Sequence, residues 1–231
     1  MREAIISHLE ELRARMVIVL ITIAVLFVAG FFASDYVLRL LEQSFVTSNI
    51  SLVSTTPLEF VYAKMKIGLW VSLMLSFPLI VYEAFMFVRP AMRKHEKRLL
   101  NALLPFSMFL FLAGAAFCYF ILLKLGLGFF ASMASEAGVE NLWNVNKFVS
   151  FVFISCASLG LIFQMPIIIY LLNKLGIISV ETLKNNRRYV IVGIFVFAAA
   201  ITPPDVVSQV LVAIPVLVLY EVSILIVRIL R

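Results

Sequence analysis

The sequence predicts an all-α polytopic membrane protein with six transmembrane helices, both termini in the cytoplasm, and a hairpin formed by short helices five and six. Of its 231 residues, 63% are hydrophobic and only 14% are charged. An ordinary globular domain has about 45–50% apolar and about 25% charged residues. A single soluble domain of this length could not bury so much apolar surface, so lipid has to be its solvent.

Six mostly uncharged stretches mark the helices, and the second and the sixth each contain one glutamate. They span residues 16–34, 67–88, 99–123, 148–173, 189–202 and 206–227. A helix needs about 20 residues to cross a hydrocarbon core of about 30 Å, so the first four are ordinary spans. Pro203 and Pro204 remove amide donors between the last two, which therefore form a hairpin.

The fifth helix is the shortest, because residues 189–202 rise only about 21 Å. A helix of this length predicts local thinning of the bilayer or a hairpin that stops inside it. We expect this hairpin to leave a concave flank where a partner helix can lodge.

Lys and Arg are distributed unequally between the two sides of the predicted spans. The N-terminus, residues 89–98, residues 174–188 and the C-terminal tail hold three, five, four and two of them, and five remain for the opposite side. By the positive-inside rule both termini are therefore cytoplasmic. The first apolar stretch has 19 residues, more than the usual 7–15 of a signal-peptide core, so it is interpreted as a retained helix.

Two capping boxes predict where helices begin, one from Ser7 to Glu10 and one from Thr56 to Glu59. The second box predicts a helix from Pro57 to about Val88. Residues 35–55 and 124–146 are too polar to span and too long for tight turns, so we expect structured caps on the outer side. Because no repeat or flexible linker interrupts the chain, residues 1–231 are expected to form one domain.

Enzyme chemistry has little support in this sequence. It contains no phosphate-binding loop, no HExxH metal motif and no GxSxG elbow. Two cysteines and two histidines are too few for a disulfide framework or a multi-ligand metal site, and no cofactor is expected. Cys118 and Cys156 each lie four residues from a glycine, which is typical of close helix packing. The net charge of +6 fits cytoplasmic membrane loops better than nucleic-acid binding.

Four groups of residues occur in order along nearly the whole chain. They are His8–Arg13 (HLEELR), Phe87–Pro90 with Lys94–Arg98, Phe163–Pro166, and Thr202–Asp205 with Ser208, Gln209 and Ala213–Pro215. Together they resemble the TatC subunit of the twin-arginine protein translocase. The resemblance implies a receptor in a prokaryotic inner membrane for signal peptides that bear paired arginines on folded cargo. It also implies a homo-oligomeric receptor complex, TatA/TatB-type single-span partners and transport driven by the proton-motive force.

By this resemblance, the arginine pair is received by Glu11 and Glu96, in a pocket shaped by Arg13, Phe87 and Arg98. A carboxylate can accept the planar fork of a guanidinium through two charge-assisted hydrogen bonds. Each acid also has a simpler interpretation. Glu11 can pair with Arg15 one turn further along its own helix, and Glu96 can be a solvated acid among the bases of its loop.

Three further polar residues are predicted to lie in the membrane and to contact a partner, namely Gln164, Glu221 and Asp205. The family often has glutamate at the first of these positions, whereas glutamine cannot titrate. Each has an alternative role. Gln164 can satisfy the carbonyl freed by Pro166, Glu221 can be a neutral hydrogen-bonded acid, and Asp205 can belong to the turn.

Two other functions are also compatible with a multi-pass membrane protein. A secondary transporter with a midplane site is expected to show an internal repeat and ionisable residues at depth. An intramembrane enzyme needs a nucleophile with a base, or a metal site, inside the spans. Neither pattern is found in the sequence, which therefore favours the receptor.

Overall fold

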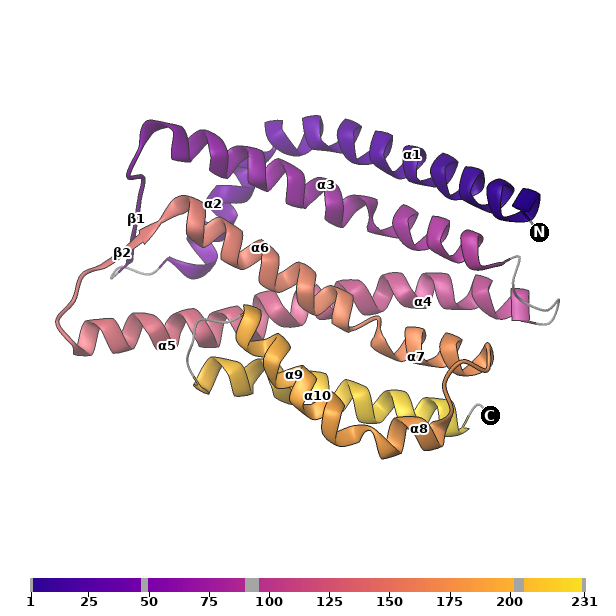
Figure 1. Cartoon of the computed structure of the whole chain (residues 1–231). Helices are drawn as coiled ribbons and strands as arrows, with labels where there is room; N and C mark the ends of the chain where they lie inside the picture. Colours follow the sequence, from indigo (N-terminus) through magenta and orange to yellow (C-terminus); the bar gives the residue numbers. More distant parts are fainter. Residues whose placement is uncertain (1, 47–49, 90–95, 202–205, 230–231) are drawn as a thin grey trace. The chain divides into compact units, whose positions relative to one another are not determined.

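The computed structural model describes residues 2–46, 50–89, 96–201 and 206–229, most of them helical (Figure 1). Side chains are described from residue 9 of the first helix and from residue 103 of the fourth. The chain forms two compact units. Unit 1 comprises residues 1–108 and 131–153, and unit 2 comprises residues 109–130 and 154–231.

The core of unit 1 is a pair of long helices, α1 (Arg2–Phe32) and α3 (Pro57–Val88), which lie side by side and antiparallel (Figure 1). The two helices touch backbone to backbone at Gly30 and Gly68. A Cβ atom added to Gly30 would lie 2.8 Å from the backbone oxygen of Gly68, so only glycine permits this approach. The same register brings Arg15 of α1 opposite Glu83 of α3.

The start of α3 agrees with its predicted capping box. Pro57 occupies the first turn, and the Glu59 carboxylate accepts hydrogen bonds from the backbone N–H groups of Thr55 (2.6 Å) and Thr56 (3.3 Å). The predicted end of this helix at Val88 is also confirmed.

The first predicted capping box is wrong. The first helix begins at Arg2, so Ser7 lies inside the helix rather than at its N-cap. The residues that precede Ser7 include good helix formers and neither glycine nor proline, so nothing ends the helix before this serine.

The predicted outer caps are structured and meet in a small sheet. The first contains α2 (Ser34–Phe45) and β1 (Ile50–Val53), and the second contains α5 (Leu123–Glu136) and β2 (Asn141–Asn144). The two strands pair in parallel, with Ile50 opposite Asn141. The amide of Asn144 donates to the Glu59 carboxylate at 3.0 Å and so ties the sheet to the start of α3. The parallel pairing was not predicted from the sequence.

Unit 2 contains the C-terminal parts of α4 (Glu96–Phe117) and α6 (Val145–Ile162), the π-helix η2 (Cys118–Leu122), and four further helices. These are α7 (Met165–Lys174), α8 (Val180–Asn185), α9 (Arg187–Ile201) and α10 (Val206–Ile229). Glycines again allow close packing. A Cβ atom on Gly114 would lie 2.7 Å from the Phe163 ring, and one on Gly160 would lie 2.7 Å from the Phe111 ring. The prediction of small-residue packing next to Cys118 and Cys156, both buried, is confirmed.

Five helical stretches of the described residues are long and apolar enough to cross a membrane. They are Leu9–Phe32, Pro57–Phe87, Leu103–Glu136, Val145–Lys174 and Val206–Ile229. With α9 they account for the six predicted helices. The 15 residues of α9 rise about 22 Å, which confirms the short fifth helix. The sixth is not short as expected, because the 24 residues of α10 rise about 36 Å.

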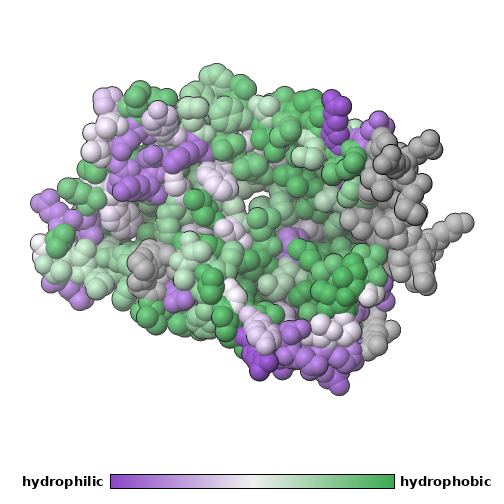
Figure 2. All heavy atoms as spheres, viewed as in Figure 1, coloured by the Kyte–Doolittle hydropathy of each residue, from purple (hydrophilic) through white to green (hydrophobic). Residues whose placement is uncertain are grey.

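Apolar side chains cover much of the surface of the helices (Figure 2). In unit 1, Val25 is 65% exposed and Phe32 is 80% exposed, and in unit 2, Val196 is 65% exposed. Such exposure is unfavourable in water and favourable in lipid. The chain is therefore a multi-pass membrane protein.

Candidate functional site

One arginine and two glutamates form a cluster on the α1–α3 pair, here named the Arg15 cluster (Glu11, Arg15 and Glu83). The Arg15 guanidinium donates to Oε1 of Glu11 from Nη2 at 2.6 Å and from Nε at 3.2 Å. Its Nη1 donates to Oε2 of Glu83 at 2.6 Å. The Glu83 side chain is 12% exposed, against 24% for Arg15 and 36% for Glu11, so the contact between the helices is the more buried of the two.

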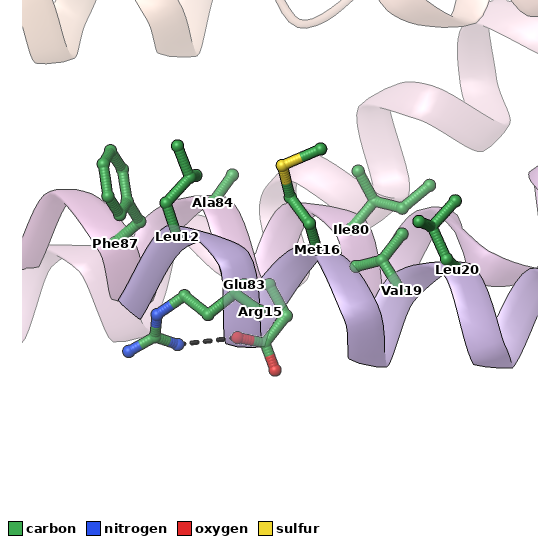
Figure 3. A pocket seen from close by; sticks show the side chains of 9 residues that line it. All are labelled: Leu12, Arg15, Met16, Val19, Leu20, Ile80, Glu83, Ala84 and Phe87. Atoms are coloured by element: carbon green, nitrogen blue, oxygen red, sulfur yellow. Dashed lines mark hydrogen bonds and ion pairs between the residues drawn. The ribbon is translucent and has the colours of Figure 1, made fainter. Parts of the chain in front are cut away.

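An apolar groove of about 390 Å³ lies beside this cluster, between α1 and α3, and is named the α1–α3 groove. Figure 3 shows Arg15 and Glu83 pointing toward each other next to the apolar side chains. Besides these two residues, the groove is lined by Leu12, Met16, Val19, Leu20, Ile80, Ala84 and Phe87. The site thus joins acidic side chains to a surface that suits an apolar segment.

Local sequence explains why these side chains meet. Glu11 and Arg15 are four residues apart on α1 and therefore share one face of the helix. The antiparallel register set by Gly30 and Gly68 then brings Glu83 opposite Arg15. Both carboxylates already bind one guanidinium, so the geometry and charge of the site suit this chemical group.

The structure brings together two of the five residues predicted to bind a signal peptide. Glu11 belongs to the Arg15 cluster, and Phe87 lines the adjoining groove. Arg13 is exposed on α1. The side chains of Glu96 and Arg98 lie outside the described residues, although the backbone places both in the first turn of α4. The simpler interpretation of Glu11, an ion pair with Arg15, is present in the structure.

Sequence reasoning did not assign Arg15 and Glu83 to the site. The two residues are 68 positions apart, so no local pattern connects them. A signal was nevertheless present, because Glu83 is the one acid in an otherwise uncharged stretch from Ile67 to Val88. An ionisable residue inside a membrane span generally has a partner.

Gln164 lies at a break between α6 and α7, inside the apolar stretch Val145–Lys174. The chain leaves the helical path at Phe163 and Gln164, because Pro166 has no N–H for the carbonyl four residues earlier. Gln164 is 7% exposed and precedes α7, and its backbone carbonyl accepts from the N–H groups of Ile167 and Ile168. An apolar groove of about 300 Å³, the α6–α7 groove, is lined by Ser158, Leu161, Ile162, Met165, Ile168 and Phe197.

Glu221 has a charged partner within unit 2, which the sequence did not identify. Its carboxylate pairs with Nη2 of Arg187 at 2.6 Å, and the two side chains are 52% and 45% exposed. The pair forms because α9 begins at Arg187 beside α10. The neighbouring Tyr220 donates to the carbonyl of Leu183 at 2.7 Å and holds α8 against α10. The remaining predicted residue, Asp205, lies outside the described residues.

Comparison with known proteins gives a consistent result. The family model described as Sec-independent protein translocase protein (TatC) matches residues 7–215. The chain is 38% identical over 221 residues to the TatC protein of Aquifex aeolicus, covering 94% of this chain and 92% of that protein. It is 36% identical over 225 residues to TatC of Escherichia coli (strain K12), covering 96% and 87%.

The fold agrees as well as the sequence. A crystal structure of the twin-arginine translocase receptor TatC superimposes with a TM-score of 0.87 at 37% identity, covering 96% of this chain and 98% of that one. The secondary-transporter alternative has no support in these comparisons. The chain therefore belongs to the TatC family of Sec-independent protein translocase proteins.

Proposed function

We propose that the chain is the signal-peptide receptor and a core subunit of a twin-arginine translocase. The single observation that carries this proposal is the pairing of guanidinium-binding carboxylates with an apolar groove on α1 and α3. A signal peptide has a basic segment followed by about 7–15 apolar residues. The Arg15 cluster suits the basic segment, and the α1–α3 groove suits the apolar one.

Two arginines need two acceptors, and the second is proposed to be Glu96. Glu11 lies on α1, which packs against α3. The helix α3 ends at Val88, five residues after Glu83, and α4 begins at Glu96, so the chain keeps Glu96 close in sequence to the end of α3 that contacts Arg15. Each carboxylate would take one guanidinium through paired hydrogen bonds, which become stronger where water is partly excluded.

The site is proposed to face the cytoplasm. The N-terminal part of α1 and the C-terminal part of α3 belong to the side that holds most of the Lys and Arg, which the positive-inside rule assigns to the cytoplasm. Signal peptides of folded cargo would then be received at the inner face of a prokaryotic inner membrane.

The proposed role is that of a receptor and assembly platform, not of an enzyme. Single-span subunits of the TatA/TatB kind and further copies of this chain would complete the translocase and couple it to the proton-motive force. The short α9, together with the α6–α7 groove, supports a flank where an apolar partner helix lodges.

Crosslinking to a synthetic signal peptide tests the assignment. Glu11→Ala and Glu96→Ala should each reduce crosslinking to a peptide with consecutive arginines by roughly tenfold, the effect of losing one charge-assisted contact. Membrane insertion should be unchanged. The matched control is Glu10→Ala, because Glu10 is an exposed acid next to Glu11 on the same helix.

The site assignment is wrong if both variants bind the peptide as well as the parent does. Export separates the receptor from other functions. In cells that lack their own homologue, the parent chain should restore export of a folded, cofactor-loaded reporter whose signal peptide has paired arginines.

A further inference from the structure

The Arg15 cluster contains two residues, Arg15 and Glu83, that are not themselves proposed to receive the arginine pair. Arg15 divides its guanidinium between two helices, with one edge on Glu11 and one nitrogen on Glu83. The side chain that would receive a ligand arginine is therefore already bound by an arginine of the chain itself. A ligand guanidinium has to compete with Arg15 for Glu11.

The two contacts of Arg15 differ in how readily they can be given up. The contact with Glu11 is on the helix surface, where ion pairs add little stability. The contact with Glu83 is more buried, and a buried carboxylate left without its cation is strongly destabilised. Arg15 can therefore release Glu11 to a ligand and keep its charge compensated by Glu83.

We infer that Arg15 is an internal competitor that sets the affinity of the signal-peptide site and that Glu83 is its positioning residue. Arg15 competes for Glu11, and Glu83 holds Arg15 when the ligand arrives. An arginine can replace Arg15 on Glu11 with the same planar fork of donors, whereas a lysine offers a single compact ammonium. The preference for arginine comes from this fork, whereas the competition weakens binding of either peptide by the same factor, because it lowers the fraction of Glu11 that is available. This inference rests on the proposed function.

Binding of two peptides to the full chain in lipid nanodiscs tests the inference. One fluorescent synthetic signal peptide has consecutive arginines, and the other has lysines at the same two positions. The measured quantities are the two dissociation constants and their ratio.

Three variants give different expected results. Arg15→Gln removes the competitor, so both peptides should bind roughly tenfold more tightly and the ratio of their dissociation constants should stay the same. Glu83→Gln leaves Arg15 on Glu11 alone, so the arginine peptide should bind roughly tenfold more weakly. In the double variant, with both substitutions, the arginine peptide should again bind at least as tightly as it does to the parent.

The double variant distinguishes positioning from a merely structural role, and it leaves no unpaired buried acid. If Glu83→Gln and the double variant bind the arginine peptide equally weakly, or if Arg15→Gln binds neither peptide more tightly than the parent does, the inference is overturned. The matched control is Lys64→Gln, which removes the cation of the Asp35–Lys64 pair (2.8 Å) near the start of α3 and should change neither constant.

If the proposed receptor function is wrong, the same binding experiment gives a different result. In that case the parent itself would show no preference for the arginine peptide, and Glu11→Ala would bind both peptides like the parent. A parent that prefers arginine through Glu11, together with unresponsive Arg15 and Glu83 variants, would overturn only the competition described here.

Discussion

The α1–α3 pair and the α9–α10 pair use the same two residue types in different ways. In unit 1, Arg15 lies between Glu11 and a Glu83 side chain that is only 12% exposed. In unit 2, Arg187 pairs with Glu221, and both side chains are about half exposed. Contact length does not separate them, because the shortest N–O distance in each is 2.6 Å.

The Arg187–Glu221 pair and the Arg15 cluster differ in how far their side chains are buried and in how many carboxylates share one guanidinium. These two differences decide what each arrangement can do. The exposed pair holds one carboxylate against one guanidinium and contributes little to stability. The cluster in unit 1 places two carboxylates around one guanidinium beside an apolar groove. An ion pair is therefore informative about function when it is partly buried, shared and adjacent to a surface that a ligand can occupy.

The largest expected effect concerns the backbone contact that positions the cluster. Gly30→Val should destabilise the protein by about 3 kcal/mol or more, because the new side chain would meet the backbone of Gly68, which cannot move aside. Thermal unfolding in detergent micelles measures this effect. The control is Gly193→Val in α9, where an added Cβ atom meets nothing within 4 Å.

A smaller effect is expected from the ion pairs themselves. Arg15→Ala should reduce stability by about 2 kcal/mol, because it leaves the carboxylate of Glu83 without its charged partner. Arg187→Ala should reduce it by less than about 1 kcal/mol, because that pair is exposed. If Arg15→Ala and Arg187→Ala lose the same stability in this unfolding assay, the contrast between the Arg15 cluster and the Arg187–Glu221 pair is wrong.

A smaller effect than that of Arg15→Ala is expected at the close contact inside unit 2. Gly160→Ala should cost about 1 kcal/mol, because its Cβ atom would meet the Phe111 ring rather than backbone, and a ring can shift. A loss as large as that of Gly30→Val would show that unit 2 is packed as rigidly as the α1–α3 pair.

Much of the fold could be predicted from the sequence, because lipid requires every backbone polar group to be satisfied inside its own segment. This requirement turns apolar stretches into helices whose positions hydropathy reveals. The bounds of α3 from Pro57 to Val88 and the short α9 followed from local signals of this kind. The candidate acid Glu11 was found through a motif within six consecutive residues.

The features that could not be predicted from the sequence depend on residues that are far apart in the chain. The Arg15–Glu83 contact spans 68 positions, and the parallel pairing of Ile50 with Asn141 joins two separate caps. The Arg187 partner of Glu221 could not be identified from the sequence either, whereas the helix break near Gln164 was expected from Pro166. Local composition decides which segments become helices. Helix register and close glycine contacts decide which side chains meet, and the register and these contacts are set only by packing in three dimensions.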